Sequence, residues 1–260
     1  MSKKGILIVS FGTSYEDTRR KTIGAIEESI QKAFPDYKVY RAFTSKIIKR
    51  NLEKKGVLVF NVQEAIEQIM KDGNTKELIV QPTFITNGIE YDMLHDDINP
   101  YYESFEKIYF GHPLLTGQED YKELATIMKE AFPIEEDEVL VLMGHGSDHH
   151  ANAAYPAFED VLEEMGYDRI LVGTLEGYPS LNEVKKQLAK LQVKKLCLAP
   201  MMIVAGNHAN HDMIGGEGSW KWELEKAGYE VRYYMNGLGE LEGVQQMFIR
   251  HVKETEELLV

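Results

Sequence analysis

Gly5-Ile-Leu-Ile-Val-Ser-Phe-Gly-Thr-Ser14 has the same pattern of residue types as a second stretch of the chain. That stretch is Val139-Leu-Val-Leu-Met-Gly-His-Gly-Ser-Asp148. Each is a continuous apolar run that ends in glycine and other small residues. Such a run is typical of a parallel strand covered on both faces, and the glycines permit a sharp turn where the strand ends. The ungapped alignment places Phe11 opposite His145, so the same position carries different chemistry in the two stretches.

A second pair of stretches matches in the same order along the chain. Gln81-Pro-Thr-Phe-Ile-Thr-Asn-Gly-Ile-Glu90 aligns without gaps with Ala199-Pro-Met-Met-Ile-Val-Ala-Gly-Asn-His208, which places Glu90 opposite His208. Two matches in register predict an internal duplication. We therefore expect two similar halves, residues 1–134 and 135–260.

Strand-like runs alternate with amphipathic stretches along both halves. This alternation predicts an α/β fold with two doubly wound domains, each a four-stranded parallel sheet flanked by helices. Ligands of such sheets bind outside the carboxyl ends of the strands, so we expect an active-site cleft between the halves. The expected strands are 5–10, 38–43, 77–81, 107–110, 138–143, 169–174, 195–200 and 229–234, and the expected helices are 18–34, 62–71, 121–132, 153–165, 180–191 and 241–257.

Composition excludes several classes of protein. The net charge of −13 disfavours binding to nucleic acid or to an anionic membrane surface. A single cysteine, Cys197, excludes a disulfide framework and a cysteine-cluster metal site. The first residues lack a secretory apolar segment, and no apolar run has the roughly 20 residues that a membrane span needs. These features predict a soluble cytoplasmic protein.

Histidines gather where two expected strands end. Five of the eight lie in residues 144–150 and 206–212. Imidazole binds transition metals and titrates near neutrality, so we interpret His145 and His208 as a metal site or proton acceptor, with Glu90 as an added carboxylate. The alternative for any single histidine is a solvated or helix-capping role. We expect His149 and His150 to begin a helix and to shape the pocket or its surface.

The turn after the first strand is a second candidate binding element. Phe11, Gly12, Thr13 and Ser14 offer an aromatic ring, backbone amides and two hydroxyls, which together could hold an anionic ligand. Ordinary N-capping of a helix by Thr13 or Ser14 is the alternative interpretation.

Seven short motifs resemble one protein family. The similarity runs from the first strand to the last helix, and the motifs keep their order and approximate spacing. The motifs are Val9-Ser-Phe-Gly-Thr-Ser-Tyr15, Arg41-Ala-Phe-Thr-Ser45, Asn87-Gly-Ile-Glu-Tyr91, Met143-Gly-His-Gly146, His149-His150, Glu176-Gly-Tyr-Pro179 and Val204-Ala-Gly-Asn-His208. Together they resemble the anaerobic sirohydrochlorin cobaltochelatases of the CbiK type, which are class II chelatases.

The resemblance implies a function and a site. Members of the family insert a divalent metal into a tetrapyrrole, here Co²⁺ into sirohydrochlorin on the early-insertion route to cobalamin, with release of two pyrrole protons. Their catalytic and metal-binding residues map onto His145, Glu90 and His208. Co²⁺ is then both substrate and bound metal, and no organic cofactor is expected. The macrocycle would pack against Phe11 and the turn that follows it.

Two alternative functions and several partners stay open. The chain could be a ferrochelatase acting on sirohydrochlorin or a porphyrin, or a metal- or tetrapyrrole-binding protein without turnover. A homo-oligomer is possible. Because the protein is acidic and sirohydrochlorin is a polycarboxylate, we also expect local compensation from basic residues. The candidates are Arg19, Arg41, Lys46 and Arg50.

Overall fold

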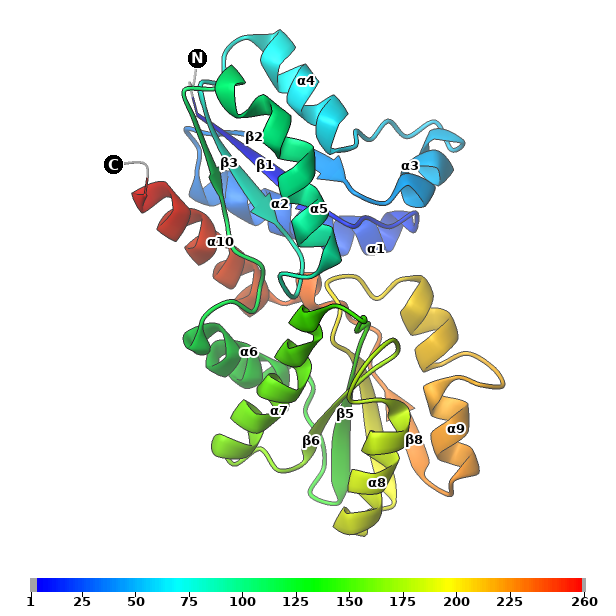
Figure 1. The fold of residues 1–260 in the computed structure, drawn as a ribbon. Coiled ribbons are helices and arrows are strands. Elements are labelled where there is room, and N and C mark those ends of the chain that lie inside the picture. The colour runs from blue at the N-terminus through cyan, green and yellow to red at the C-terminus, as the bar shows by residue number, and fades with distance from the viewer. Residues whose placement is uncertain (1–3, 259–260) are drawn as a thin grey trace. The chain divides into compact units, whose positions relative to one another are not determined.

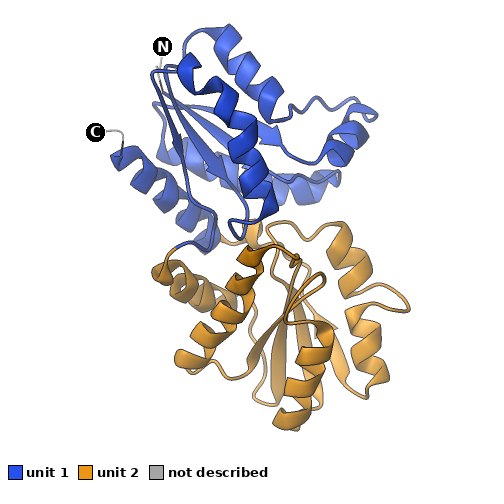
Figure 2. Ribbon diagram, in the orientation of Figure 1, with its two compact units in different colours: residues 1–116, 242–260 blue, residues 117–241 orange. Residues whose placement is uncertain are grey.

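The computed structural model describes residues 4–258 and separates the chain into two compact units. Unit 1 consists of residues 1–116 and 242–260, and unit 2 of residues 117–241 (Figures 1 and 2). Each unit contains one four-stranded parallel sheet flanked by helices. The predicted fold class is therefore confirmed.

The sheet of unit 1 has the strand order β2-β1-β3-β4. Side chains of β1 alternate between the two faces, which is why its run of apolar residues is buried throughout. Leu7 and Val9 join a core with α4 and α5, and α2 and α10 cover the other face. The elements are β1 (Lys4–Ser10), α1 (Glu16–Lys21), α2 (Ile23–Ala33), β2 (Lys38–Phe43), α3 (Lys46–Glu53), α4 (Val62–Asp72), β3 (Glu77–Pro82), α5 (Ile89–Ile98), a 3₁₀ turn (Asn99–Ser104), β4 (Lys107–Phe110) and α10 (Glu242–Glu257).

The sheet of unit 2 has the equivalent order β6-β5-β7-β8. Val139, Val141 and Met143 of β5 pack in a core with α8 and α9. The elements are α6 (Gln118–Ala131), β5 (Glu138–Gly144), a 3₁₀ turn (His150–Ala153), α7 (Ala154–Glu164), β6 (Ile170–Thr174), α8 (Leu181–Leu191), β7 (Lys195–Pro200), a π-helical turn (Ala209–Met213), α9 (Trp220–Lys226), β8 (Glu230–Tyr233) and a 3₁₀ turn (Leu238–Glu240).

Each of the two sheets contains the same hydrogen bonds at aligned positions. The strand pairing Val9–Pro82 in unit 1 corresponds to Met143–Pro200 in unit 2. Just beyond these pairs, the Thr83 N–H donates to the Val9 carbonyl and the Met201 N–H donates to the Met143 carbonyl, both at 2.8 Å. The two sequence matches therefore occupy equivalent positions in two copies of one architecture.

The compact units differ from a simple division at residue 134. Leu115 and Gly239 make equivalent hydrogen bonds at the end of each half, to Ile85 and Ile203, and α6 and α10 follow them. Yet α6 packs against α7 in unit 2, and α10 packs against α2 and β3 in unit 1. The two halves exchange their last helices. Sequence alternation cannot reveal this exchange, because an amphipathic helix shows which of its faces is buried but not which sheet covers that face.

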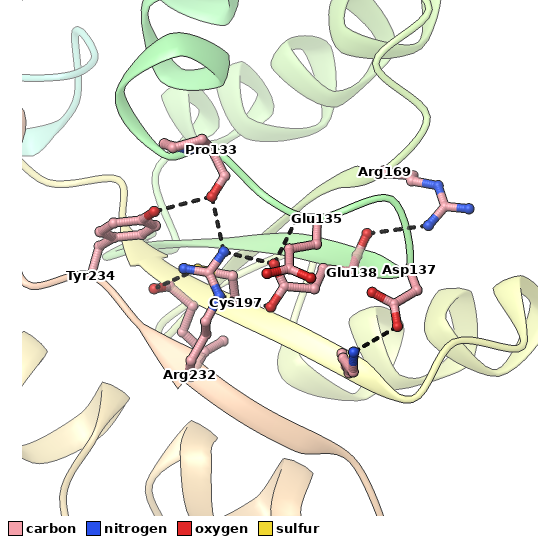
Figure 3. A network of polar contacts seen from close by, with 10 residues as sticks. Pro133, Glu135, Asp137, Glu138, Arg169, Cys197, Arg232 and Tyr234 are labelled. Atoms are coloured by element: carbon pink, nitrogen blue, oxygen red, sulfur yellow. Dashed lines mark hydrogen bonds and ion pairs between the residues drawn. The ribbon is translucent and has the colours of Figure 1, made fainter.

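A partly buried ion pair lies at the start of β5 in unit 2 (Figure 3). Glu138 at the start of β5 accepts hydrogen bonds from Arg232 Nε at 2.7 Å and Nη2 at 2.6 Å. Arg232 and the Tyr234 hydroxyl also donate to the Pro133 carbonyl. This network ties the segment between α6 and β5 to the edge strand β8. The hydrogen bonds from Arg232 hold the pKa of Glu138 below its usual value.

The single cysteine has the structural role that the sequence suggests. Cys197 lies inside β7 and is fully buried, and burial raises the pKa of its thiol to about 11. A thiol with such a pKa is a poor nucleophile at neutral pH. Within residues 4–258, no helix combines the length and the apolar character that crossing a bilayer requires.

Candidate active site

His145 lies in the turn directly after β5. Gly144 and Gly146 on either side of it are both required. A side chain at Gly144 would collide with the buried Tyr155 ring, and a Cβ at Gly146 would lie 2.5 Å from the Glu176 carbonyl oxygen. Gly146 also has a φ of +74°, which favours glycine. The sequence fixes a tight turn that leaves the imidazole half-exposed.

His208 is held by the turn that follows β7. The π-helical turn (Ala209–Met213) begins directly after it, and Ala209 and Met213 anchor this turn in the core. The His208 Nδ1 atom lies 2.9 Å from Oδ2 of Asp212, four residues along the chain. Single π-turns of this kind are frequent at functional sites.

The structure brings His145 and His208 together. Their ring centroids are 4.6 Å apart and the ring planes are at 85°. The strands that precede them, β5 and β7, are neighbours in the sheet, so their carboxyl-end loops are adjacent. The structure therefore places the two histidines that the sequence singles out next to each other.

Hydrogen bonds leave the same ring atom of both histidines available. His145 Nδ1 lies 2.9 Å from the Gly146 carbonyl, and His208 Nδ1 faces the Asp212 carboxylate. A carbonyl or a carboxylate oxygen accepts, so Nδ1 carries the proton in each neutral ring and Nε2 keeps its lone pair. Two such Nε2 atoms can bind a divalent transition metal or accept a proton.

The neighbouring histidines have a different role. The His149 and His150 ring centroids are 4.0 Å apart, with the ring planes tilted by 40°. His149 Nδ1 accepts a hydrogen bond from the Ala151 N–H at 3.2 Å at the start of the 3₁₀ turn. His149 therefore carries its proton on Nε2 when neutral. This agrees with the prediction that these two residues begin a helix.

Glu90 belongs to unit 1 and lies in the first turn of α5. Its Oε2 atom is buried and has no hydrogen-bond partner among the described residues. A buried carboxylate oxygen without a partner is costly, so it is suited to an external proton or cation. Glu90 thus has the chemistry that the sequence suggests for it, while both histidines belong to unit 2.

Two carboxylates beside the histidines escaped the sequence reasoning. Asp212 bonds to His208, and the Glu176 N–H donates to the His145 carbonyl at 2.8 Å, which brings an exposed glutamate to the loop next to His145. Among residues 4–258, no three His, Cys, Asp or Glu side chains already form a cluster that could hold a metal. The pair of imidazoles is therefore the nucleus of the site.

Phe11, in the turn after β1, occupies in unit 1 the position that His145 occupies in unit 2. The Ser45 N–H donates to the Phe11 carbonyl, as the Glu176 N–H does to that of His145. The Phe11 side chain is 50% exposed, and Gly12, with a φ of +99°, packs against the Phe43 ring. The N-cap residue of α1 is Tyr15, and no side chain among the described residues caps the helix. The alternative interpretation that Thr13 or Ser14 is the N-cap is therefore wrong.

One of the basic residues expected to face an anionic ligand is already neutralised. Arg41 forms a two-pronged ion pair with Glu27, which raises the pKa of the guanidinium, and both side chains line a pocket of about 370 Å³ beside β2. Arg19 instead donates to the Thr13 carbonyl at 3.4 Å and so lies beside the turn. Arg19 is the better candidate for local charge compensation.

Comparison with known proteins identifies the family. Residues 4–257 match the family described as "Cobalt chelatase (CbiK)". The chain belongs to the cobalt chelatase (CbiK) family. The sirohydrochlorin cobaltochelatase of Salmonella typhimurium strain LT2 is 33% identical over 261 residues, covering 99% of this chain and 98% of that protein. Sirohydrochlorin cobaltochelatase CbiKC of Nitratidesulfovibrio vulgaris Hildenborough is 30% identical over 257 residues, covering 97% of this chain and 90% of the relative.

Solved structures of other proteins show the same fold. SirB from Bacillus subtilis with Fe³⁺ superposes with a TM-score of 0.67 at 18% identity, over 97% of this chain and 95% of that chain. CbiX, described as the terminal enzyme for siroheme biosynthesis in denitrifying bacteria, gives a TM-score of 0.56 at 14% identity, over 96% and 98% of the two chains. At these identities the likeness concerns the fold, which this member of the CbiK family shares.

Proposed function

We propose that this chain is a sirohydrochlorin cobaltochelatase, which inserts Co²⁺ into sirohydrochlorin and releases two protons. Two relatives at 30% and 33% identity over nearly the whole chain carry that name. The observation that carries the proposal is the pair His145 and His208, whose Nε2 atoms are both left with a free lone pair. No feature of the described residues favours iron or a role without turnover.

The reaction needs groups that hold a metal and groups that accept protons. Two N–H bonds of the macrocycle break and two protons pass to bases. The two electron pairs left on nitrogen and the lone pairs of the other two ring nitrogens then form four bonds to Co²⁺, which gives up the ligands that it carried before. We assign His145 as the acceptor of a pyrrole proton, because imidazole titrates near operating pH. His208 and Glu90 hold the Co²⁺ ion or accept the second proton. Co²⁺ is a substrate in this scheme.

The turn after β1 supplies a surface for the macrocycle. Phe11 exposes half of its ring at the carboxyl end of the sheet, where ligands of α/β sheets bind. An exposed aromatic side chain is suited to stacking on a flat conjugated ring. We therefore assign Phe11 and the residues Gly12, Thr13 and Ser14 to substrate binding, with Arg19 beside them.

Metal preference cannot follow from affinity alone. Imidazole and carboxylate ligands bind Ni²⁺ and Cu²⁺ more tightly than Co²⁺, in the Irving–Williams order. Geometry, exchange rate or metal supply must therefore select cobalt. The product would enter cobalamin biosynthesis in the cytoplasm, a setting with which the single buried thiol is compatible.

The test is an insertion assay with purified protein. Sirohydrochlorin and limiting Co²⁺ are mixed with and without protein, and the visible spectrum of the macrocycle is followed over time. We expect the protein to accelerate insertion of Co²⁺ above the spontaneous rate, and the acceleration to depend on His145. Parallel reactions with Fe²⁺ and Ni²⁺ give the metal preference. No acceleration with any of the three ions would refute the proposal.

A further inference from the structure

The hydrogen bond between His208 and Asp212 has a consequence for the site. A neutral imidazole carries one proton, and the hydrogen bond at one nitrogen decides which nitrogen holds it. Asp212 Oδ2 lies 2.9 Å from Nδ1, and an ionised carboxylate only accepts. Asp212 therefore favours the form of His208 that keeps its lone pair on Nε2.

The backbone fixes Asp212 in place for this contact. Ala209 and Met213, the residues at the two ends of the π-helical turn, are fully buried in the core of unit 2. The Asn210 side chain donates to the Gly206 carbonyl at 2.7 Å, one turn back. The turn that carries Asp212 is thus anchored in the core on both sides of the residue that makes the contact.

The chain after the π-helical turn packs closely against the backbone of the turn. A Cβ at Gly215 would collide with the backbone carbonyl of His211, so only glycine lets the chain pass there. The Ser219 hydroxyl then donates to the Gly215 carbonyl at 2.9 Å. These contacts in the segment from His208 to Ser219 hold the backbone of Asp212 where its carboxylate meets the Nδ1 edge of the imidazole ring.

His145 reaches the same protonation form by another route. Its Nδ1 faces the Gly146 carbonyl, a backbone group that no side-chain substitution removes. Only His208 depends on a side chain for its orientation. The two histidines of the pair can therefore be separated experimentally through Asp212.

We propose that Asp212 is a positioning residue, which orients His208 and holds its proton on Nδ1 so that Nε2 can bind the Co²⁺ substrate. The proposal rests on the proposed function for the identity of the metal. Carboxylates that accept from the far nitrogen of a metal-binding histidine typically contribute about 10- to 100-fold in metal affinity or activity.

The test uses Asp212→Ala and a control, Glu217→Ala, which removes the same charge from an exposed position in the following loop. Histidine-labelled protein without metal is studied at about pH 8, where free imidazole is mostly neutral, by two-bond ¹H–¹⁵N correlation spectra. A His208→Ala spectrum assigns the signals. We expect His208 of the unsubstituted protein and of E217A to carry its proton on Nδ1, and that of D212A to shift toward the Nε2–H form.

Co²⁺ titration of the same samples gives the second readout. We expect the Kd for Co²⁺ to rise about 10- to 100-fold in D212A and to stay unchanged in E217A, with the same melting temperature in all three proteins. A D212A protein that retains the Nδ1–H form, or that binds Co²⁺ as tightly as the unsubstituted protein, would overturn the proposal. Because the spectra require neither metal nor tetrapyrrole, a failure of the insertion assay refutes the chelatase function separately.

Discussion

The imidazole ring of His145 lies edge-on to that of His208, with 4.6 Å between the ring centroids. The two residues are distant in the sequence, and adjacent strands of one parallel sheet bring them together. Each ring uses Nδ1 for a local hydrogen bond and leaves Nε2 available. One unit of the molecule thus carries a preformed two-imidazole site.

Removal of His145 should nearly abolish metal insertion. We expect His145→Ala to lower kcat for Co²⁺ insertion by about 10²- to 10⁴-fold, the usual contribution of a positioned acid or base. His150→Ala is the control, because His150 is an exposed histidine near the same loop and its ring contacts that of His149. Insertion rates from visible spectra check both variants. Full activity in H145A would remove His145 from the mechanism.

The carboxylate that assists the histidines can be identified by comparing two glutamates. We expect Glu90→Gln to slow insertion by about 10²-fold, because its buried Oε2 has no protein partner among the described residues. Glu176→Gln changes an exposed carboxylate whose backbone bonds to His145, and we expect a smaller loss. If E176Q loses more activity than E90Q, the role passes to Glu176.

Strands were predictable from sequence and several helices were not. All eight expected strands are present within one residue at either end, because buried parallel strands are continuous apolar runs. The helices α3, α5 and α9 were missed. Each of them buries only one or two side chains, so the apolar pattern in the sequence is short: Leu52 in α3, Leu94 and Ile98 in α5, and Trp220 and Leu224 in α9.

Some residues of the candidate site were also predictable from the sequence and others were not. His145 and His208 were predictable, because both follow strands whose carboxyl ends must be adjacent. Asp212 was not, because its contact with His208 depends on a π-helical turn that no residue pattern announces. The exchange of α6 and α10 between the units was hidden for a similar reason, since it depends on long-range packing.

A side chain at Gly146 should lower activity and stability more than a side chain at Gly166. Gly146 and Gly166 have nearly the same φ, +74° and +73°, but a Cβ at Gly146 meets the Glu176 carbonyl and one at Gly166 meets nothing within 4 Å. Both alanine variants incur the cost of a left-handed residue, about 1 kcal/mol.

Only Gly146→Ala should also displace the His145 loop. We therefore expect G146A to lower insertion activity strongly and to lose about 1–3 kcal/mol more stability than G166A, as measured by urea unfolding. G166A should retain the activity of the unsubstituted protein. Equal activity and stability in the two variants would show that the space around Gly146 does not matter.

The ion pair between Glu138 and Arg232 should stabilise unit 2 in a pH-dependent way. The Glu138 side chain is 6% exposed, so Arg232→Ala leaves a buried carboxylate without its main partner. Fully buried pairs lose about 3–5 kcal/mol on such a change, and we expect about 2 kcal/mol because Arg232 itself is 42% exposed. Lys195→Ala, which breaks the exposed pair with Asp137, is the control and should cost under about 1 kcal/mol.

The sign of the pH dependence follows from the lowered pKa of Glu138. Because the folded protein holds this pKa below the value of 4.5 for a free glutamate, the contribution is complete above about pH 5 and is lost as the pH falls through the folded-state pKa. Urea unfolding of the unsubstituted protein and R232A should therefore differ at pH 7 and converge as the pH drops well below 4.5. A difference that stays constant across this range would mean that Arg232 stabilises β8 through packing on Tyr234 and its bond to Pro133, and not through the charge on Glu138.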